Sequence, residues 1–202
     1  MNIIQSHQFA TYCIDPDEFH PSKVQTIDTL IATLKQQSKG QTVFYEGGEP
    51  NNEKYFGEGF ESWFATAAKL RGHDKRIDLI DYLPAGKDEF GVDGYSGCHL
   101  EPLVYGKAGV QCKATSDARK VFDRFNTGNI GTPIEAVAVE RLDRILFVTT
   151  GAGVHPKILA TWNRNWDMVR VLNRNDLANI FDNSLDVWET WHQSLLTAQV
   201  SV

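Results

Sequence analysis

The sequence has no long hydrophobic run. No apolar stretch among its 202 residues approaches the roughly 20 residues that a membrane-spanning helix needs. The first residues, MNIIQSHQFATYC, also lack the basic start and the long apolar core of a secretory signal. We therefore expect a cytoplasmic protein that does not associate with membranes.

Cysteine is scarce as well. Cys13, Cys98 and Cys112 are odd in number and widely spaced, so they fit neither a disulfide framework nor a zinc site of the CxxC type. We interpret them as reduced structural thiols.

Positive charge is also limited. The chain has 20 Lys and Arg against 26 Asp and Glu, a formal net charge of −6, which argues against a strongly basic coat for nucleic acid. The balance is uneven: residues 1–57 hold four basic and seven acidic residues, whereas residues 141–180 hold six and three. A polyanion would therefore prefer the later part of the chain.

The hydrophobic fraction of 42% and the charged fraction of 23% are those of an ordinary globular protein. The length fits one main domain with an appendage. Residues 21–40, PSKVQTIDTLIATLKQQSKG, predict an amphipathic helix, and the Gly, Pro and Asn of residues 46–59 predict a loop after it. We expect residues 1–50 to form an N-terminal helical extension.

The rest of the sequence predicts a series of helices and strands. Helices are expected over 59–70, 132–143, 155–165, 175–181 and 184–196, and strands over 75–83, 90–97, 103–115, 144–151 and 168–173. Residues 116–131 are ambiguous, part helix and part loop. A strand meander followed by βαβ crossovers predicts an α/β fold, with a mixed central sheet flanked by helices.

The stretch GVQCKAT, residues 109–115, has polar residues where a covered strand should be apolar. Gln111 and Lys113 share one face of the predicted strand, and on a covered sheet both would need partners. Asp93, in FGVDGYSG, ends the preceding strand, so a hairpin would bring it beside them. A carboxylate and an amide oxygen suit Mg²⁺, and a Lys can orient water, as metal-assisted phosphodiester hydrolysis requires.

The alternative for Gln111 and Lys113 is a solvated strand face. Glu61, in the helix predicted before the strands, is equally well interpreted as an ordinary surface residue of that helix.

Together, Glu61, "GVDG" around Asp93 and "VQCK" ending at Lys113 resemble the PD-(D/E)XK nuclease superfamily, and within it the Mrr-like restriction endonucleases and Holliday-junction resolvases. The likeness continues through "RILFVTTG" and "VRVLNRNDLANI" and covers residues 57 to 182. It implies a restriction-endonuclease-like nuclease domain over residues 57–202. The implied activity is that of an endonuclease or exonuclease that cuts DNA with Mg²⁺, or with Mn²⁺ as a substitute.

Carried over by position, the resemblance makes Asp93 the central metal ligand and Lys113 the catalytic lysine. Gln111 stands where most of the superfamily has Glu or Asp, although Mrr-like members often have Gln. The backbone carbonyl of Cys112 would also face the metal. Glu61 matches the helix carboxylate of some members, with Glu58 as a rival one turn earlier.

Because Gln111 is uncharged, the site has one negative charge fewer than a site with Glu or Asp at this position. Metal binding would therefore depend on the helix carboxylate. Arg119, Lys120 and Arg124 follow the lysine closely and would contact DNA phosphates, or form an exposed charged helix face. Cutting both strands of a duplex would be simplest for a homodimer.

Two further segments have plainer interpretations. TTGAGVHPK, residues 149–157, lacks the GxxxxGK[ST] spacing of a phosphate loop, so we expect a strand end and a helix start. Thr149 and Thr150 would then lie near the site. Near the C-terminus, helical spacing predicts that three residues are packing residues: Trp188, Trp191 and Leu195.

Two other functions stay open. The first is a nucleic-acid-binding module of the same fold without catalysis, which the net acidity and the missing strand carboxylate favour. The second is a protein-interacting accessory factor of phage or restriction systems that docks through its N-terminal helix. A large exposed apolar stripe along Val24, Ile27 and Leu34 would support that function.

Overall fold

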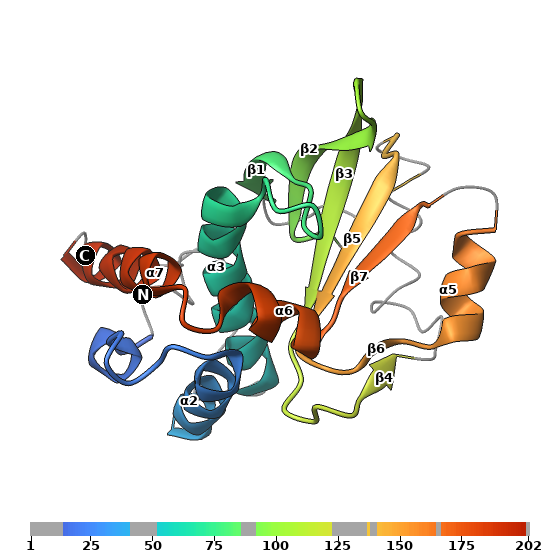
Figure 1. Cartoon of the computed structure of the whole chain (residues 1–202). Helices are drawn as coiled ribbons and strands as arrows, with labels where there is room; N and C mark the ends of the chain where they lie inside the picture. Colours follow the sequence, from blue (N-terminus) through green and yellow to red (C-terminus); the bar gives the residue numbers. More distant parts are fainter. Residues whose placement is uncertain are drawn as a thin grey trace, which may run out of the picture.

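A five-stranded mixed sheet forms the centre of the fold in the computed structural model (Figure 1), which describes residues 14–40, 52–85, 92–122, 137, 141–164 and 167–200. Its strand order is β1-β2-β3-β5-β7. The first three strands form an antiparallel meander, and β5 and β7 continue the sheet in parallel with β3. The strands are β1 (Ile80–Pro84), β2 (Gly94–Glu101), β3 (Val104–Lys113), β5 (Arg144–Thr149) and β7 (Val169–Leu172).

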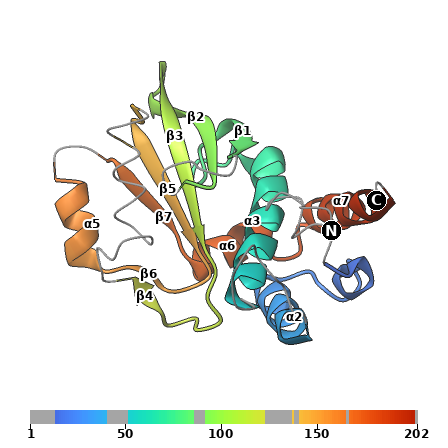
Figure 2. The same cartoon turned by 180° about the vertical axis from the view of Figure 1, so that it is seen from behind.

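Helices cover both faces of this sheet. Helices α2, α3, α6 and α7 lie on one side and α5 lies on the other (Figures 1 and 2). The helices are η1 (Pro16–Phe19), α2 (Ile27–Gly40), α3 (Asn52–Arg71), α5 (Pro156–Trp162), α6 (Arg174–Phe181) and α7 (Leu185–Val200). The predicted α/β class, a mixed central sheet flanked by helices, is confirmed. None of these described helices is both long and apolar enough to cross a membrane.

The sheet separates two hydrophobic clusters. On the α3 side, Val110 and Cys112 of β3 pack with the aromatic side chains of the helices. On the α5 side, Phe147 of β5 packs with Met168 and Val169. All six residues of β5 are buried, as expected of a parallel strand covered on both faces.

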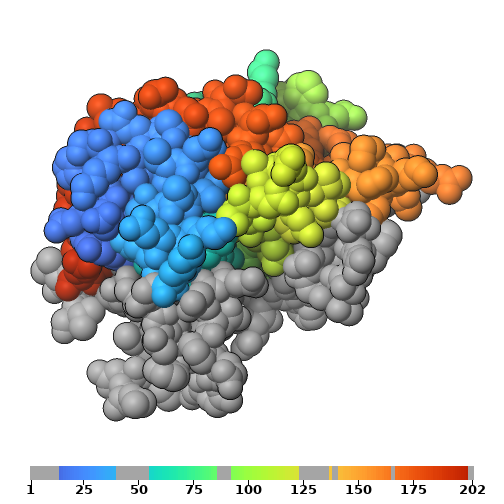
Figure 3. All heavy atoms as spheres, turned by 90° about the horizontal axis from the view of Figure 1, so that it is seen from below, coloured from blue at the N-terminus to red at the C-terminus, as the bar shows by residue number. Residues whose placement is uncertain are grey.

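The N-terminal segment belongs to the first of these clusters. Val24, Ile27 and Leu34 are 1%, 0% and 0% exposed. Figure 3 shows this segment, in blue, lying against the C-terminal helices, in red. These three residues therefore do not form the exposed apolar stripe that would support an accessory factor. The division of the chain at residue 50 stays a prediction.

Aromatic packing joins α3 to the C-terminal helix. Trp63 stacks on Trp188 with ring centroids 5.3 Å apart, and Trp188 Nε1 donates to the Phe181 carbonyl at 3.1 Å. Trp191 and Leu195 are fully buried. The packing interpretation of these C-terminal residues is confirmed.

Several predicted boundaries were wrong. The predicted loop over 46–59 ends earlier, because α3 begins at Asn52 and buries Tyr55 and Phe60 in the core. The first strand spans 80–84 rather than 75–83, because a turn held by Asp74 precedes it. Residues 116–120 are not helical, and β4 (Val121–Phe122) pairs in parallel with β6 (Gly153–Val154).

Other predictions agree or cannot be compared. His155 is the N-cap of α5, its ring Nδ1 accepting from the Lys157 backbone N–H at 3.2 Å. Cys98 and Cys112 are free and buried. Cys13 and most of the helix predicted over 132–143 lie outside the described residues.

Candidate active site

The candidate site lies where β3 extends beyond the start of β2. Gly94 opposes Val110, and the Asp93 backbone N–H donates to the Val110 carbonyl at 2.7 Å. Beyond this point the Cys112 backbone N–H donates to Asp93 Oδ2 at 2.6 Å rather than to a backbone carbonyl of a neighbouring strand. The Asp93 side chain thus provides the hydrogen-bond acceptor for β3 at the point where β2 no longer pairs with it.

Gln111 completes this arrangement from the same strand. Its Nε2 donates to Asp93 Oδ2 at 2.6 Å and to the Cys112 carbonyl at 3.3 Å. The side chain is only 1% exposed, so the alternative of a solvated strand face is wrong for Gln111. Its Oε1 is buried and has no hydrogen-bond partner among the described residues, a state that costs free energy unless a ligand satisfies it.

Lys113 follows on the same face and is half-buried. Burial raises the pKa of the Asp93 carboxyl to about 6, although the Cys112 N–H, the positive charge of Lys113 and the Gln111 amide all act to lower it. The strand end that carries Lys113 is fixed by its neighbour β5, because Thr149 Oγ1 donates to the Lys113 carbonyl at 2.8 Å. The predicted proximity of Thr149 to this group is confirmed.

Tyr82, on β1, is a neighbour of the site that the sequence analysis missed. It is buried, and its hydroxyl donates to the Asp93 carbonyl at 3.3 Å. Burial raises the pKa of Tyr82, and the negative charges of Cys112, Asp93 and Glu61 raise it further. A Cβ on Gly94 would collide with the Tyr82 ring. A glycine directly after Asp93 was the one signal in the sequence for such a close approach.

Glu61 lies on α3, which covers the face of the sheet opposite to Gln111 and Lys113. Burial raises the pKa of the Cys112 thiol, and the charges of Asp93 and Glu61 raise it further. The Glu61 carboxylate therefore lies within electrostatic range of the site. Glu58, one turn earlier on α3, is buried at 7% exposure.

The basic residues after Lys113 lie in an exposed turn rather than on a helix. The Arg119 backbone N–H donates to Asp117 Oδ1 at 2.9 Å, and the Lys120 carbonyl accepts from the Ala152 N–H at 2.8 Å. The latter bond ties Lys120 to the segment that follows β5. The predicted charged helix face is thus wrong for Arg119 and Lys120, and Arg124 lies outside the described residues.

The oxygen atoms of the site fit a hard cation better than a softer metal. Within the described ranges, no three His, Cys, Asp or Glu side chains converge on one point. What the site offers instead is the Asp93 carboxylate, the unsatisfied Oε1 of Gln111 and the carbonyl of Cys112. Carboxylate, amide and backbone oxygens are ligands that Mg²⁺ accepts, with water completing its octahedron.

No protein-family profile and no curated protein sequence matches the chain. Among solved structures, the chain is similar to a DNA modification-dependent restriction endonuclease, AspBHI, with 12% sequence identity and a TM-score of 0.49. The match covers 98% of this chain and 43% of that protein, so the chain spans less than half of its length.

Proposed function

We propose that this protein hydrolyses phosphodiester bonds of DNA in a metal-dependent reaction. One observation carries the proposal: the Asp93 carboxylate, the Gln111 amide and the Cys112 backbone form a hydrogen-bonded group at the end of β3, directly beside Lys113. This is the combination of groups, on neighbouring strands, that the resemblance to PD-(D/E)XK nucleases implies.

The proposed cofactor is Mg²⁺, with Mn²⁺ as a substitute. Asp93, Gln111 Oε1 and the Cys112 carbonyl would hold it, and the Glu61 carboxylate would add negative charge from the α3 side. Bound there, the ion would stabilise the negative charge that develops on the phosphate and on the departing oxygen. Because burial raises the pKa of Asp93 to about 6, a proton and the cation compete for this carboxylate near neutral pH.

The protein's own groups have distinct tasks. The Lys113 ammonium donates hydrogen bonds, so it can orient a water molecule toward the phosphorus and offset the charge of the phosphate oxygens. The water oxygen forms the new bond to phosphorus and releases a proton to solvent. The sugar oxygen on the opposite side leaves with the bonding pair and takes up a proton from solvent. Thr149 positions Lys113 through its hydrogen bond to the Lys113 carbonyl. Arg119 and Lys120 would contact phosphates further along the strand.

A second function has support from one feature of the site. Gln111 supplies an amide where a second strand carboxylate would bind the metal more strongly, and the described side chains contain no cluster of three acidic, His or Cys ligands. A DNA-binding module of this fold without catalysis would have such a site.

The test is cleavage of linear and supercoiled DNA by the wild-type protein and by Lys113→Ala, with Mg²⁺, with Mn²⁺ and with chelator. Lys157→Ala, an exposed lysine at the start of α5, is the matched control. Metal-dependent cleavage that Lys113→Ala loses and Lys157→Ala retains supports the nuclease. DNA binding without cleavage under every metal condition supports the binding module.

A further inference from the structure

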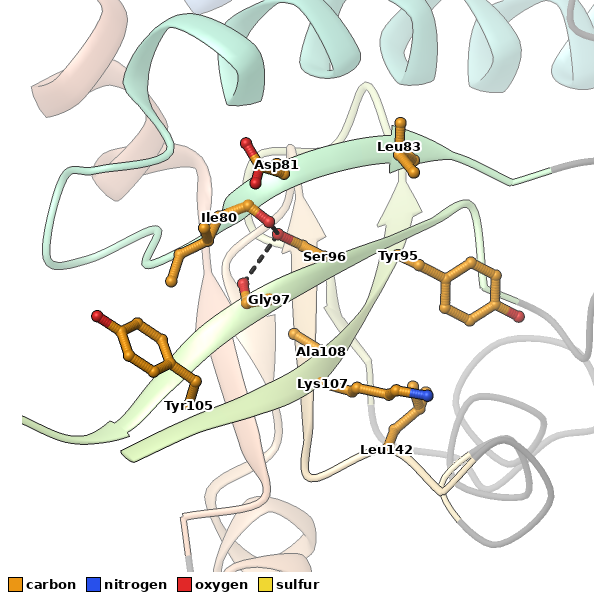
Figure 4. Close-up of a pocket in the computed structure, with 10 residues that line it drawn as sticks. All are labelled: Ile80, Asp81, Leu83, Tyr95, Ser96, Gly97, Tyr105, Lys107, Ala108 and Leu142. Carbon is orange, nitrogen blue, oxygen red and sulfur yellow. Dashed lines mark hydrogen bonds between the residues drawn. The ribbon is translucent and has the colours of Figure 1, made fainter. Parts of the chain in front are cut away.

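A groove crosses β1, β2 and β3 (Figure 4). Its volume of about 580 Å³ lies in the range of small-molecule pockets, roughly 300–1,000 Å³. The lining combines aromatic, aliphatic and charged residues with a glycine and an alanine on its floor: Ile80, Asp81, Leu83, Tyr95, Ser96, Gly97, Tyr105, Lys107, Ala108 and Leu142.

The groove and the candidate site share one face of the sheet. Tyr105 and Lys107 occupy alternate positions of β3 that lead to Gln111 and Lys113, and alternate residues of a strand point to the same face. On β2, Tyr95 lies two residues after Asp93, a distance of about 7 Å along the strand. Tyr95 is therefore the end of the groove nearest Asp93, and a nucleic-acid strand that extends from Lys113 past Asp93 would enter the groove there.

The two tyrosines frame the groove. Figure 4 shows the rings of Tyr95 and Tyr105 at opposite ends, with Gly97 between them. Tyr95 opposes Gly109, which is four residues from Tyr105, so the backbones of the two tyrosines are separated by about 13 Å along the sheet. Tyr105 is 66% exposed. Its ring contacts that of His99, with centroids 5.1 Å apart, and the exposed part is available to a ligand.

We propose that this groove binds unpaired bases of the substrate strand, next to the phosphodiester bond that is cleaved. The inference rests on the proposed nuclease function and specifies its substrate as DNA with a single-stranded segment, such as an end, a flap or a junction. Aromatic rings beside a basic residue are how proteins bind single strands, because each base stacks on a ring while Lys contacts the backbone. Tyr105 is exposed, and Tyr95 is partly buried against the hydrophobic cluster on this side of the sheet. In a continuous duplex the bases stack on one another and offer no free face to these rings.

The chemistry of the lining favours this occupant over a second copy of the chain. Lys107 and Asp81 stand among the tyrosines of the groove, whereas the centre of a stable protein interface is depleted of charged residues. Lys107 is exposed and its side chain runs along the groove wall toward Leu142 (Figure 4). That position suits a backbone phosphate between the bases held at Tyr95 and Tyr105.

The experiment compares binding of a labelled single-stranded oligonucleotide with binding of the blunt duplex of the same sequence, measured by fluorescence anisotropy in chelator so that no cleavage occurs. The variants are Tyr105→Ala and Tyr105→Phe. Leu103→Ala, which changes an 88% exposed residue outside the groove on the same hairpin, is the control. Because Tyr105 is exposed, its removal should leave the fold intact.

Tyr105→Ala removes one base-stacking interaction, so it should weaken binding of the single strand about 5- to 150-fold. Binding of the duplex should change little. Tyr105→Phe keeps the ring and should bind like wild type, as should Leu103→Ala. Equal single-strand affinity of wild type and Tyr105→Ala would overturn the inference, as would a changed oligomeric state in Tyr105→Ala with unchanged DNA binding.

The two proposals fail separately. Loss of cleavage in Lys113→Ala, with unchanged single-strand binding, concerns the nuclease alone. If the wild-type protein binds single strands through Tyr105 but cleaves no DNA, the proposal for the groove holds and the proposed nuclease function is wrong.

Discussion

The Asp93 carboxylate and the Gln111 amide lie 2.6 Å apart, with the amide nitrogen also 3.3 Å from the Cys112 carbonyl. The nitrogen thus lies between the Asp93 and Cys112 oxygen atoms that would help to hold the proposed cation. A half-turn of the amide would remove the nitrogen and bring Oε1, which has no partner among the described residues, to the same point. Gln111 therefore satisfies Asp93 without a metal, and its Oε1 would be able to act as a ligand of the proposed Mg²⁺.

Gln111→Glu should lower the stability of the metal-free protein and raise its affinity for Mg²⁺. Two adjacent carboxylates repel each other, so the variant should melt at a lower temperature than wild type in chelator at pH 8. Additional ligand charge should tighten Mg²⁺ binding about tenfold. Calorimetric titration and thermal melting measure the two effects, with Gln193→Glu on the exposed face of α7 as the control. Unchanged Mg²⁺ affinity would show that the residue is not a ligand.

Asp93→Asn should stabilise the metal-free protein at high pH only. Burial raises the pKa of Asp93 to about 6, so protonation favours the folded state, and this contribution is full below pH 4 and lost as the pH rises through 6. Asn keeps a carbonyl that accepts the Cys112 N–H but carries no buried charge. The gain at pH 8 should be on the order of 2 kcal/mol in the free energy of unfolding.

Urea unfolding in chelator at pH 4 and at pH 8 measures this difference. Glu189→Gln, at an exposed position of α7, serves as the control for a lost surface charge. A gain of the same size at both pH values would contradict the assigned protonation behaviour of Asp93.

Gly94→Ala should disturb the site through Tyr82. The added methyl group would overlap the buried Tyr82 ring, so either the ring or β2 has to move, at a cost of roughly 1–3 kcal/mol. The movement would also displace Asp93, whose carbonyl accepts from the Tyr82 hydroxyl. Cleavage and thermal stability should both fall, and adding Tyr82→Ala should restore part of the cleavage. Wild-type cleavage by Gly94→Ala would show that Tyr82 does not position Asp93.

Trp63→Ala should cost about 3–5 kcal/mol in the free energy of unfolding, as truncation of a buried aromatic residue usually does. Trp63 is 0% exposed and stacks on Trp188. Trp63→Phe should cost clearly less, because it keeps a ring and removes a buried Nε1 that has no partner among the described residues. Urea denaturation measures both, with Leu185→Ala, a 48% exposed position, as the control. Equal losses in the two Trp63 variants would contradict this.

Local patterns were sufficient to predict the central part of the fold. The alternation in GVQCKAT and the glycines around Asp93 predicted a hairpin, and the β2–β3 register pairs Gly94 with Val110. The same alternation predicted that Gln111 and Lys113 share a face. The extent of each helix was predicted less well, because distant contacts determine it.

Two features depended on residues far apart in the sequence. Helix α2 begins at Ile27 rather than at residue 21, because its first free N–H donates to Asp182 Oδ1 at 2.9 Å. Tyr82 contacts Asp93 because β1 pairs with β2. The sequence predicted the first strand but not the register that brings these two residues together. Neither contact leaves a periodic pattern in the sequence.

The bond between Ile27 and Asp182 joins positions 155 residues apart, and the ring of Phe19 meets that of Trp191 at 5.0 Å. During synthesis the N-terminal segment therefore emerges long before the helices that cover it. Until then its apolar side chains have no complete core to enter, and nascent chains in this state are prone to aggregate. Contacts of such long range also slow folding, so the protein should depend on chaperones at high expression and yield more soluble product when it is synthesised slowly.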